Sequence, residues 1–277
     1  MYKEIAIISD IHGNLEALKA VLDDIRERNI KEIICLGDII SKGINTNECI
    51  KLVKKNCIKV VKGNWEDNLD KVNDIKDDVK KKRVNFILSQ LDNTNLNYLT
   101  TLPFSVEFYM SGRLIRLFHS HPERINELIG NIDRIDRYYE LFLPSKYTLS
   151  NLKADVVIYG HIHVQHSQKI YNRIILNTGS VGNSVDLYRN KDKDGNVKNT
   201  TLANYLIIKG DYNSRFYSKF SYEFVNIPYD IEKELENNKD NLEFDDYKNE
   251  LLFGKYRDEQ KLHDIYCPIR GIDKDKI

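Results

Sequence analysis

The fold is decided by residues 3–38, KEIAIISDIHGNLEALKAVLDDIRERNIKEIICLGD. The apolar, β-branched run at 3–9 is typical of a buried strand, and residues 15–29 repeat apolar positions at helical spacing. A second apolar run follows at 31–36. A strand, a helix and a strand in this order predict a βαβ unit with two parallel strands.

The rest of the chain extends this pattern and then changes it. A helix at 46–56 and a strand at 57–64 continue the alternation, and residues 71–102 and 131–152 are also expected to be helical. Strand patterns at 104–120, 154–163, 167–180, 202–210 and 215–230 favour antiparallel pairing, with a hairpin turn at 111–113. We therefore expect an α/β (α+β) fold: a four-layer α/β/β/α sandwich of two mixed sheets flanked by helices.

Composition narrows the class of protein. The 277 residues are 41% hydrophobic and 30% charged, as in an ordinary soluble globular protein. The 42 basic residues balance the 42 acidic residues, which argues against a stable nucleic acid partner. No apolar run approaches 18 residues, so no membrane association is expected. The four cysteines have no CxxC spacing, which favours reduced thiols and a cytoplasmic location.

Seven polar residues stand directly after apolar strand patterns, where the chain leaves the sheet. They are Asp10, His12, Asp38, Asn64, His119, His161 and His163. Ligands of open α/β sheets bind beyond the carboxyl ends of the strands, so neighbouring strands would gather these side chains into one cluster. Within DIH and HIH the polar residues are two apart, so an extended backbone points both members of each pair the same way.

A cluster of this composition predicts bound metal ions. Two carboxylates, one amide and four imidazoles are too many polar groups to bury without positive charge, and they are too mixed for a structural zinc site. Mixed oxygen and nitrogen ligands suit Mn²⁺, Fe, Zn²⁺ or Ni²⁺. Seven ligands suit two ions that share a carboxylate, the arrangement used for displacement at phosphorus.

The motifs resemble those of the calcineurin-like metallophosphoesterase superfamily. DIHGN at 10–14, GD at 37–38, GN at 63–64, the first histidine of FHSHP and GHIH at 160–163 occur in the family's order. NTGSVG at 177–182 and IPYD at 227–230 are similar to motifs of its small bacterial phosphoesterases, a branch that includes phosphodiesterases. The resemblance covers residues 1–230. Residues 231–277 form a charged, helix-prone C-terminal extension, which we expect to pack on the domain or on a partner, including a second copy in a homo-oligomer.

The resemblance implies a role for each of the seven residues. Asp10, His12 and His163 would bind one metal ion, Asn64, His119 and His161 the other, and Asp38 both. Mn²⁺ is the expected metal, with Fe, Ni²⁺, Zn²⁺ and Mg²⁺ as alternatives. A hydroxide bridging the two ions would attack the phosphorus of a small-molecule phosphoester, either a diester or a monoester. NTGSVG would pack under the metal site.

Trp65 departs from the superfamily pattern. Many members have a histidine after GN that protonates the leaving group, and an indole cannot replace it. His121 is our candidate catalytic acid, followed by Glu66 or Asp67, and Trp65 itself could stack on an aryl or nucleobase group. Asn14 is a candidate for substrate binding or for support of Asp10.

An alternative function belongs to another class. The same fold can serve as a catalytically silent scaffold that binds other proteins. Such scaffolds commonly lose metal ligands, whereas all seven positions carry ligands here, which favours the metal-dependent phosphoesterase.

Overall fold

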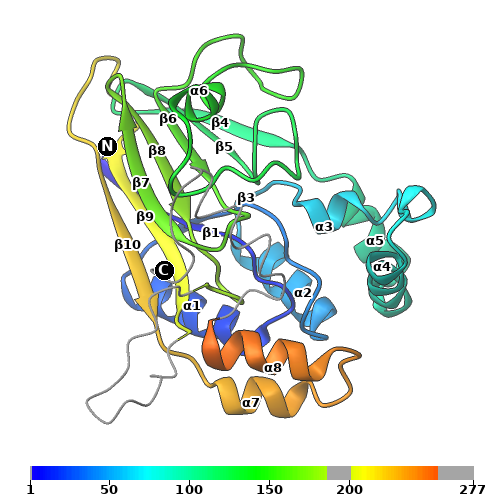
Figure 1. The fold of residues 1–277 in the computed structure, drawn as a ribbon. Coiled ribbons are helices and arrows are strands. Elements are labelled where there is room, and N and C mark those ends of the chain that lie inside the picture. The colour runs from blue at the N-terminus through cyan, green and yellow to red at the C-terminus, as the bar shows by residue number, and fades with distance from the viewer. Residues whose placement is uncertain (1, 186–200, 255–277) are drawn as a thin grey trace, which may run out of the picture.

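Two five-stranded sheets form the centre of the computed structural model, which describes residues 2–185 and 201–254 (Figure 1). The first sheet has the order β10-β9-β1-β2-β3 and the second has the order β4-β5-β6-β8-β7. Both are mixed: β1, β2 and β3 run parallel to one another, as do β5, β6 and β8, while β9, β10, β4 and β7 pair antiparallel to their neighbours. The strands are β1 (Tyr2–Ile8), β2 (Glu32–Cys35), β3 (Lys59–Val60), β4 (Ser105–Met110), β5 (Arg113–Phe118), β6 (Val156–Tyr159), β7 (Gln165–Ile170), β8 (Arg173–Thr178), β9 (Ala203–Asp211) and β10 (Ser221–Ile227).

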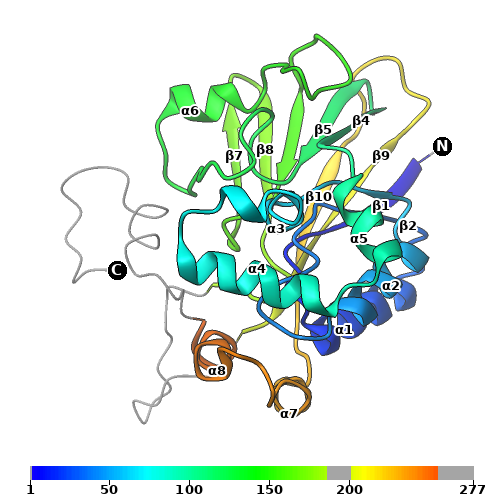
Figure 2. The same ribbon diagram turned by 90° about the vertical axis from the view of Figure 1, so that its right-hand side faces the viewer.

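Helices cover the outer face of each sheet. Figure 2 shows the layers from α6 at the top, through the two sheets, to α1 and α2 at the bottom, with α3, α4 and α5 beside them. The helices are α1 (Leu15–Glu27), α2 (Thr46–Asn56), α3 (Asn64–Asp67), the 3₁₀ turn η1 (Val72–Asp74), α4 (Asp78–Gln90), α5 (Asn93–Thr100), α6 (Ile135–Glu140), α7 (Ile231–Asn237) and α8 (Phe244–Phe253). This arrangement confirms the predicted four-layer α/β/β/α sandwich.

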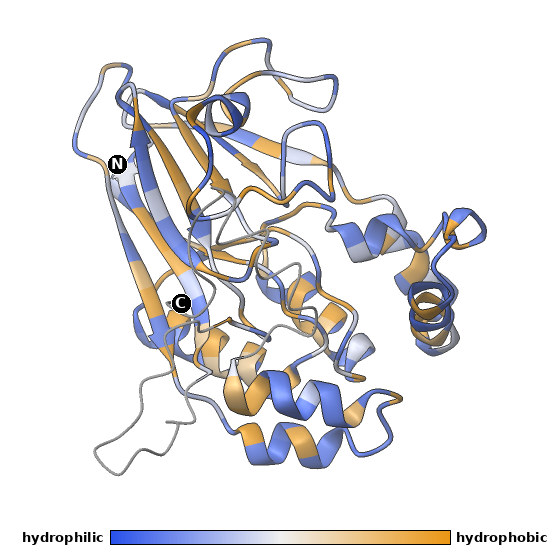
Figure 3. Cartoon of the chain, viewed as in Figure 1, coloured by the Kyte–Doolittle hydropathy of each residue, from blue (hydrophilic) through white to orange (hydrophobic). Residues whose placement is uncertain are grey.

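Each gap between layers holds its own hydrophobic core. Residues of α1 and α2 pack on the first sheet around Ile8 and Val21, and Ile7 and Leu117 lie in the core between the sheets. Phe142 belongs to the third core, on the outer face of the second sheet. The strands at the centre of Figure 3 accordingly carry most of the hydrophobic colour, and the helices carry both colours. Three separate cores explain why the strand patterns in the sequence are so strongly apolar.

The outermost layer of the second sheet differs from the prediction. Residues 131–152 were expected to be helical, but only α6 forms a helix there. The buried side chain of Arg116 on β5 donates to the backbone carbonyls of Phe142, Leu143 and Leu152 at 2.7–3.0 Å. Pro144 cannot continue an α-helix, so the chain beyond α6 is irregular, and the guanidinium group bonds carbonyls of this irregular segment.

The C-terminal helices α7 and α8 pack on the first sheet's side of the molecule, next to α1 (Figure 1). Glu234 of α7 is buried and accepts a hydrogen bond from the backbone N–H of Glu16, at 3.1 Å. Tyr247 of α8 donates its hydroxyl to Glu234 at 3.0 Å. Residues 186–200, and residues 255–277 of the predicted extension, lie outside the described residues. Among the described helices, none is long and apolar enough to span a bilayer.

Candidate metal centre

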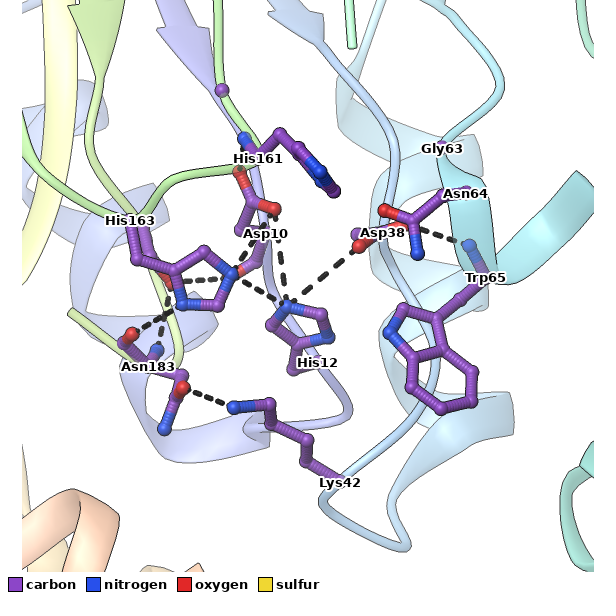
Figure 4. A network of polar contacts seen from close by, with 12 residues as sticks. Asp10, His12, Asp38, Lys42, Gly63, Asn64, Trp65, His161, His163 and Asn183 are labelled. Atoms are coloured by element: carbon purple, nitrogen blue, oxygen red, sulfur yellow. Dashed lines mark hydrogen bonds and ion pairs between the residues drawn. The ribbon is translucent and has the colours of Figure 1, made fainter. Parts of the chain in front are cut away.

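All seven predicted ligands lie together at the carboxyl ends of the parallel strands, and Figure 4 labels all of them except His119. Asp10 and His12 follow β1, Asp38 follows β2, and Asn64 begins α3 directly after β3. In the second sheet, His119 follows β5, and His161 and His163 follow β6. The facing sheets thus bring segments more than 150 residues apart into one cluster. Whether these residues bind metal stays a prediction; their gathering is a property of the fold.

One group consists of Asp10, His12 and His163, all buried. The Nε2 atoms of His12 and His163 are 3.0 Å apart. Asp10 Oδ1 lies 3.4 Å from Nε2 of His163 and 3.8 Å from Nε2 of His12. This carboxylate oxygen accepts no hydrogen bond from the described residues although it is buried, so three donor atoms face one small volume.

The second group consists of Asp38, His119 and His161, with Asn64 beside them. Nε2 of His119 lies 3.1 Å from Nδ1 of His161, 3.5 Å from Oδ2 of Asp38 and 2.9 Å from Oδ1 of Asn64. The same Oδ2 atom of Asp38 is 3.8 Å from Nε2 of His12 in the first group. Asp38 therefore lies between the two groups, where a shared ligand has to be.

The imidazoles are oriented by backbone carbonyls behind them. Nδ1 of His12, His119 and His163 lies 3.3, 2.9 and 2.6 Å from the carbonyl oxygens of Ile40, Leu36 and Asn183, respectively. A neutral imidazole has one N–H, and donating it to the carbonyl leaves the Nε2 lone pair directed into the cluster. Lone pairs 3.0 Å apart repel each other unless a cation lies between them, so this donor set fits divalent metals.

Burial and mutual charge shift the acidities of these groups. Burial, followed by the charge of His163, holds the pKa of His12 well below its ordinary value. Burial and then the charges of Glu66 and Asp10 raise the pKa of Asp38 well above its ordinary value. For Asp10, burial acts to raise the pKa, but His163 outweighs it and the pKa is lowered. Bound cations would stabilise carboxylates and neutral imidazoles that are buried together in this way.

The backbone at the ligands is strained. Asp10, His12, Asp38, His161 and His163 have φ angles of 54°, 52°, 50°, 70° and 62°, in the left-handed region that residues other than glycine rarely adopt. Each such conformation costs of order 1 kcal/mol and persists only where the surroundings enforce it. The backbone of DIH and HIH is thus left-handed and not extended as expected from the sequence, and the side chains of each pair reach the cluster from these turns.

Two glycines leave room for the carboxylates. A Cβ atom at Gly160 would collide with the carboxylate of Asp10, and one at Gly63 would collide with Asp38. The glycine before His161 is therefore required by close approach between loops of the two sheets, and the glycine before Asn64 by close approach between two loops of the first sheet. The same closeness lets the backbone N–H of His161 donate to Oδ2 of Asp10 at 2.9 Å.

Glu66 supports Asp38, a role that the sequence did not reveal. Its fully buried carboxylate accepts hydrogen bonds from the backbone N–H groups of Asp38, Ile39 and Gly63, at 2.8–2.9 Å. Burial raises its pKa, while these hydrogen bonds act to lower it. Glu66 thus ties the loop after β2 to the loop after β3 and is occupied as an acceptor.

The segment 177–183 packs under the cluster. Ser180 donates its hydroxyl to the carbonyl of Asp10 at 2.7 Å and accepts from the backbone N–H of Asn183 at 2.8 Å. The side chain of Asn177 donates to the carbonyl of Gly160 at 2.6 Å. These contacts hold the backbones of ligand residues from both sheets, which accords with the expected place of NTGSVG beneath the site.

A cavity of about 990 Å³ opens beside the cluster. Ligand residues form one side of it, and Trp65 lines it next to them. The opposite side is formed by α4 and by residues 241–243 before α8. Arg83 of α4 and Glu243 join these two segments through a pair of hydrogen bonds at 2.7 and 2.8 Å. The cavity can hold a molecule far larger than inorganic phosphate.

His121, the candidate acid, is directed elsewhere. Its Nδ1 accepts from the backbone N–H of Glu123 at 3.1 Å, and its Nε2 lies 3.2 Å from Nη2 of Arg124 and 3.5 Å from Oε2 of Glu140. Burial and the charge of Arg124 lower its pKa to about 4. His121 does not line the cavity, and a neutral acceptor at pH 7 is a poor proton donor.

The remaining predicted residues have distinct positions. Asn14 is fully buried and caps α1: it accepts from the N–H of Ala17 at 3.0 Å and donates to the carbonyl of Gly182 at 2.9 Å. Its side chain is committed to the fold and lies outside the cavity lining, whereas Trp65 remains placed to meet a substrate. Sequence reasoning missed Lys42, which lines the cavity beside His12 and Asp38. No pattern of apolar residues marks a lysine in a loop.

Comparison with known proteins identifies the family. A family model for the calcineurin-like phosphoesterase superfamily domain matches residues 4–194. The chain belongs to this superfamily. It is also similar to the uncharacterized protein MJ0912 of Methanocaldococcus jannaschii, with 32% identity over 256 residues that cover 84% of this chain and 90% of that protein.

Two solved structures share the fold of this calcineurin-like phosphoesterase. A metallophosphoesterase from Sphaerobacter thermophilus superposes with a TM-score of 0.66 at 20% identity, covering 91% of this chain and 99% of that one. A hypothetical protein, PH1004, from Pyrococcus horikoshii OT3 superposes with a TM-score of 0.70 at 16% identity, covering 91% and 98%. At these identities the likeness shows the fold, and the chemistry has to be argued from the side chains.

Proposed function

We propose that the protein is a metal-dependent phosphoesterase that hydrolyses small-molecule phosphoesters, with phosphodiesters preferred. The observation that carries this proposal is the pair of three-residue groups whose ligand atoms lie within 4.8 Å of one another in each group, with Asp38 between them. Family membership supports the same class of reaction.

The residues fit two divalent cations, with Mn²⁺ first and Fe, Ni²⁺, Zn²⁺ or Mg²⁺ as alternatives. Asp10, His12 and His163 would hold one, Asn64, His119 and His161 the other, and Asp38 both. When bound, such ions supply a water of lowered pKa and withdraw charge from phosphoryl oxygens. The carbonyls behind the histidines and the hydrogen bonds of Glu66 fix these side chains before substrate arrives, which limits reorganisation during the reaction.

The rest of the cavity favours an ester with a sizeable organic group. Trp65 beside the cluster offers an aromatic face, and the cavity volume of about 990 Å³ leaves room beyond the phosphoryl group. The described cavity lining contains no histidine besides the predicted ligands His12, His161 and His163. We therefore expect esters with good leaving groups to be hydrolysed faster than alkyl esters, because general acid catalysis contributes roughly 10²–10⁴-fold where it operates.

The test is a phosphoester panel run on the full chain after removal of metals. Bis(p-nitrophenyl) phosphate, p-nitrophenyl phosphate and an alkyl diester would each be assayed with Mn²⁺, Ni²⁺, Mg²⁺, Zn²⁺ or Fe²⁺ added, and bound metal would be counted by mass spectrometry. We expect two ions per chain and turnover that depends on them. A chain that binds two ions but hydrolyses no ester in the panel would favour the silent-scaffold function instead.

A further inference from the structure

The loop at 41–44 has an unusual conformation next to the candidate metal centre. Ser41 and Lys42 are consecutive residues with φ angles of 88° and 58°, both in the left-handed region. The loop follows Asp38 directly, and the N–H of Gly43 donates to the carbonyl of His12 at 2.8 Å. Two consecutive left-handed residues other than glycine indicate that their surroundings enforce the conformation for a purpose.

The enforcing contacts come from the C-terminal helices. Asn238 accepts from the N–H of Ile44 at 2.8 Å, and Asn241 donates to the carbonyl of Lys42 at 2.6 Å. Glu250 of α8 forms an ion pair with the ammonium group of Lys42 at 3.2 Å. Residues from the segment 238–250 therefore hold this loop at three points, two through its backbone and one through the lysine side chain.

Two of the clamping side chains are buried polar groups, which makes the arrangement specific. Glu250 is 2% exposed and Asn238 is fully buried. Glu250 also accepts from the side-chain amide of Asn183 at 3.3 Å, and the carbonyl of Asn183 orients His163. A buried carboxylate is costly unless a cation and donors satisfy it, so the position of Lys42 is tightly determined.

The lysine side chain lies at the cluster itself. Figure 4 shows it extending beneath His12 toward Asn183, whose side-chain oxygen accepts a hydrogen bond from the ammonium group. Lys42, His12, Asp38 and Glu250 all line the same cavity. An ester held by the cluster would therefore share the cavity with this ammonium group.

We propose that Lys42 is a catalytic residue that contacts the phosphoryl group of the substrate, and that Glu250 in the C-terminal extension is a positioning residue that fixes it there. This inference rests on the proposed function. It assigns the extension a part in the active site, although neither the family resemblance at 1–230 nor the matched residues 4–194 include it. The charge of Lys42 offsets charge that accumulates on phosphoryl oxygens as the phosphorus centre is attacked.

The experiment uses the full chain loaded with Mn²⁺ and compares Lys42→Met, Lys42→Arg and Glu250→Gln with the parent. The measurements are kcat and KM for bis(p-nitrophenyl) phosphate, the Kd of inorganic phosphate by calorimetry, bound manganese and the melting temperature. The matched control is Lys233→Ala, which removes an ion pair between α7 and Glu16 of α1 away from the cavity. We expect the control to match the parent in every activity and binding measurement.

For Lys42→Met we expect kcat/KM to fall about 10²-fold and the phosphate Kd to rise about tenfold, with manganese content unchanged. Lys42→Arg should recover much of the loss. Glu250→Gln should cost about tenfold in kcat/KM, and it should cost nothing further in a Lys42→Met chain, because both act through one ammonium group.

Two outcomes would overturn the inference. One is a Lys42→Met chain with the parent's phosphate affinity and turnover. The other is a Lys42→Met chain that loses manganese and melting temperature together, without recovery in Lys42→Arg, since that pattern belongs to a purely structural lysine. The proposed function fails separately: a parent chain that hydrolyses no ester but binds phosphate through Lys42 would contradict only the phosphoesterase activity.

Discussion

The candidate metal centre and the helical side of the cavity opposite it face the same space but are built differently. The centre comes from loops that follow buried strands, and its backbone is bent into left-handed conformations held by glycines, carbonyls and Glu66. The opposite side comes from α4 and residues 241–243, and the ion pair between Arg83 and Glu243 joins its two parts. We therefore expect the chemical step to depend on the candidate metal centre, and the range of substrates to depend on the side formed by α4 and residues 241–243.

The largest effect is expected from Asp38→Asn, which weakens the ligand shared by both groups. We expect loss of bound manganese and a fall in kcat/KM of about 10³-fold or more. The measurements are metal content and hydrolysis of bis(p-nitrophenyl) phosphate. Asp67→Asn is the control: Asp67 followed His121 as a candidate acid, but it does not line the cavity and it pairs with Lys71. If Asp38→Asn keeps its metal and its activity, Asp38 is not the shared ligand, and the centre is no more important for the reaction than the rest of the cavity.

Glu66→Gln tests whether the support of the centre matters as much as its ligands. Replacing the buried carboxylate leaves one oxygen to accept from several backbone N–H groups, and each buried donor without a partner costs about 1–3 kcal/mol. We expect a lower melting temperature and a fall in kcat/KM of about 10²-fold through misplacement of Asp38. Parent-like kinetics would mean that the loops hold Asp38 without Glu66.

The pH dependence of stability tests a third region, the packing of α7 on α1, through Glu234. Burial raises the pKa of this carboxyl from 4.5 to about 7. Between these values Glu234 holds its proton in the folded chain and loses it in the unfolded chain, so its contribution to stability is present at low pH and is lost as pH rises through 7. We expect the stability of the parent relative to Glu234→Gln to fall by roughly 2 kcal/mol between pH 5 and pH 8, measured by urea unfolding of both chains. A difference between the two chains that does not change with pH would contradict this role of Glu234.

The smallest effect is expected at Trp65, between the centre and the helices. Trp65→Ala should raise KM for aryl diesters about fivefold, because an aromatic contact contributes about 0.5–1.5 kcal/mol. KM for alkyl diesters should change little. The measurement is KM for a matched pair of aryl and alkyl diesters in steady-state kinetics. Equal changes in KM for both substrates would show that Trp65 does not distinguish them.

The same contrast explains what the sequence could predict. The position of the ligands follows from a rule about strand ends, so GD, GN and GHIH sufficed to gather Asp38, Asn64 and His161 in one expected cluster. The four-layer fold followed from the alternation of strand and helix patterns. Both predictions use local patterns that buried strands impose on the chain.

The residues that sequence reasoning missed depend on contacts between distant segments. Glu66 was only a candidate acid and Lys42 had no assigned role, because their contacts form only when the loops after β2 and β3 and the segment 238–250 are brought together. The helix expected at 131–152 is wrong because Pro144 cannot continue an α-helix, and Arg116 on another element bonds carbonyls of the irregular segment that results. His121 shows the reverse error: its spacing from His119 suggested chemistry, but Arg124 and Glu140 engage its ring.

The clamp on the loop at 41–44 has a consequence for how the molecule is completed during synthesis. Translation proceeds from the N-terminus, so every histidine and carboxylate of the cluster leaves the ribosome before Asn238, Asn241 and Glu250 are made. The proposed ligands are therefore all synthesised while Lys42 still lacks its anchors. In the proposed enzyme, metal would be available to the cluster before the contacts to the loop at 41–44 form.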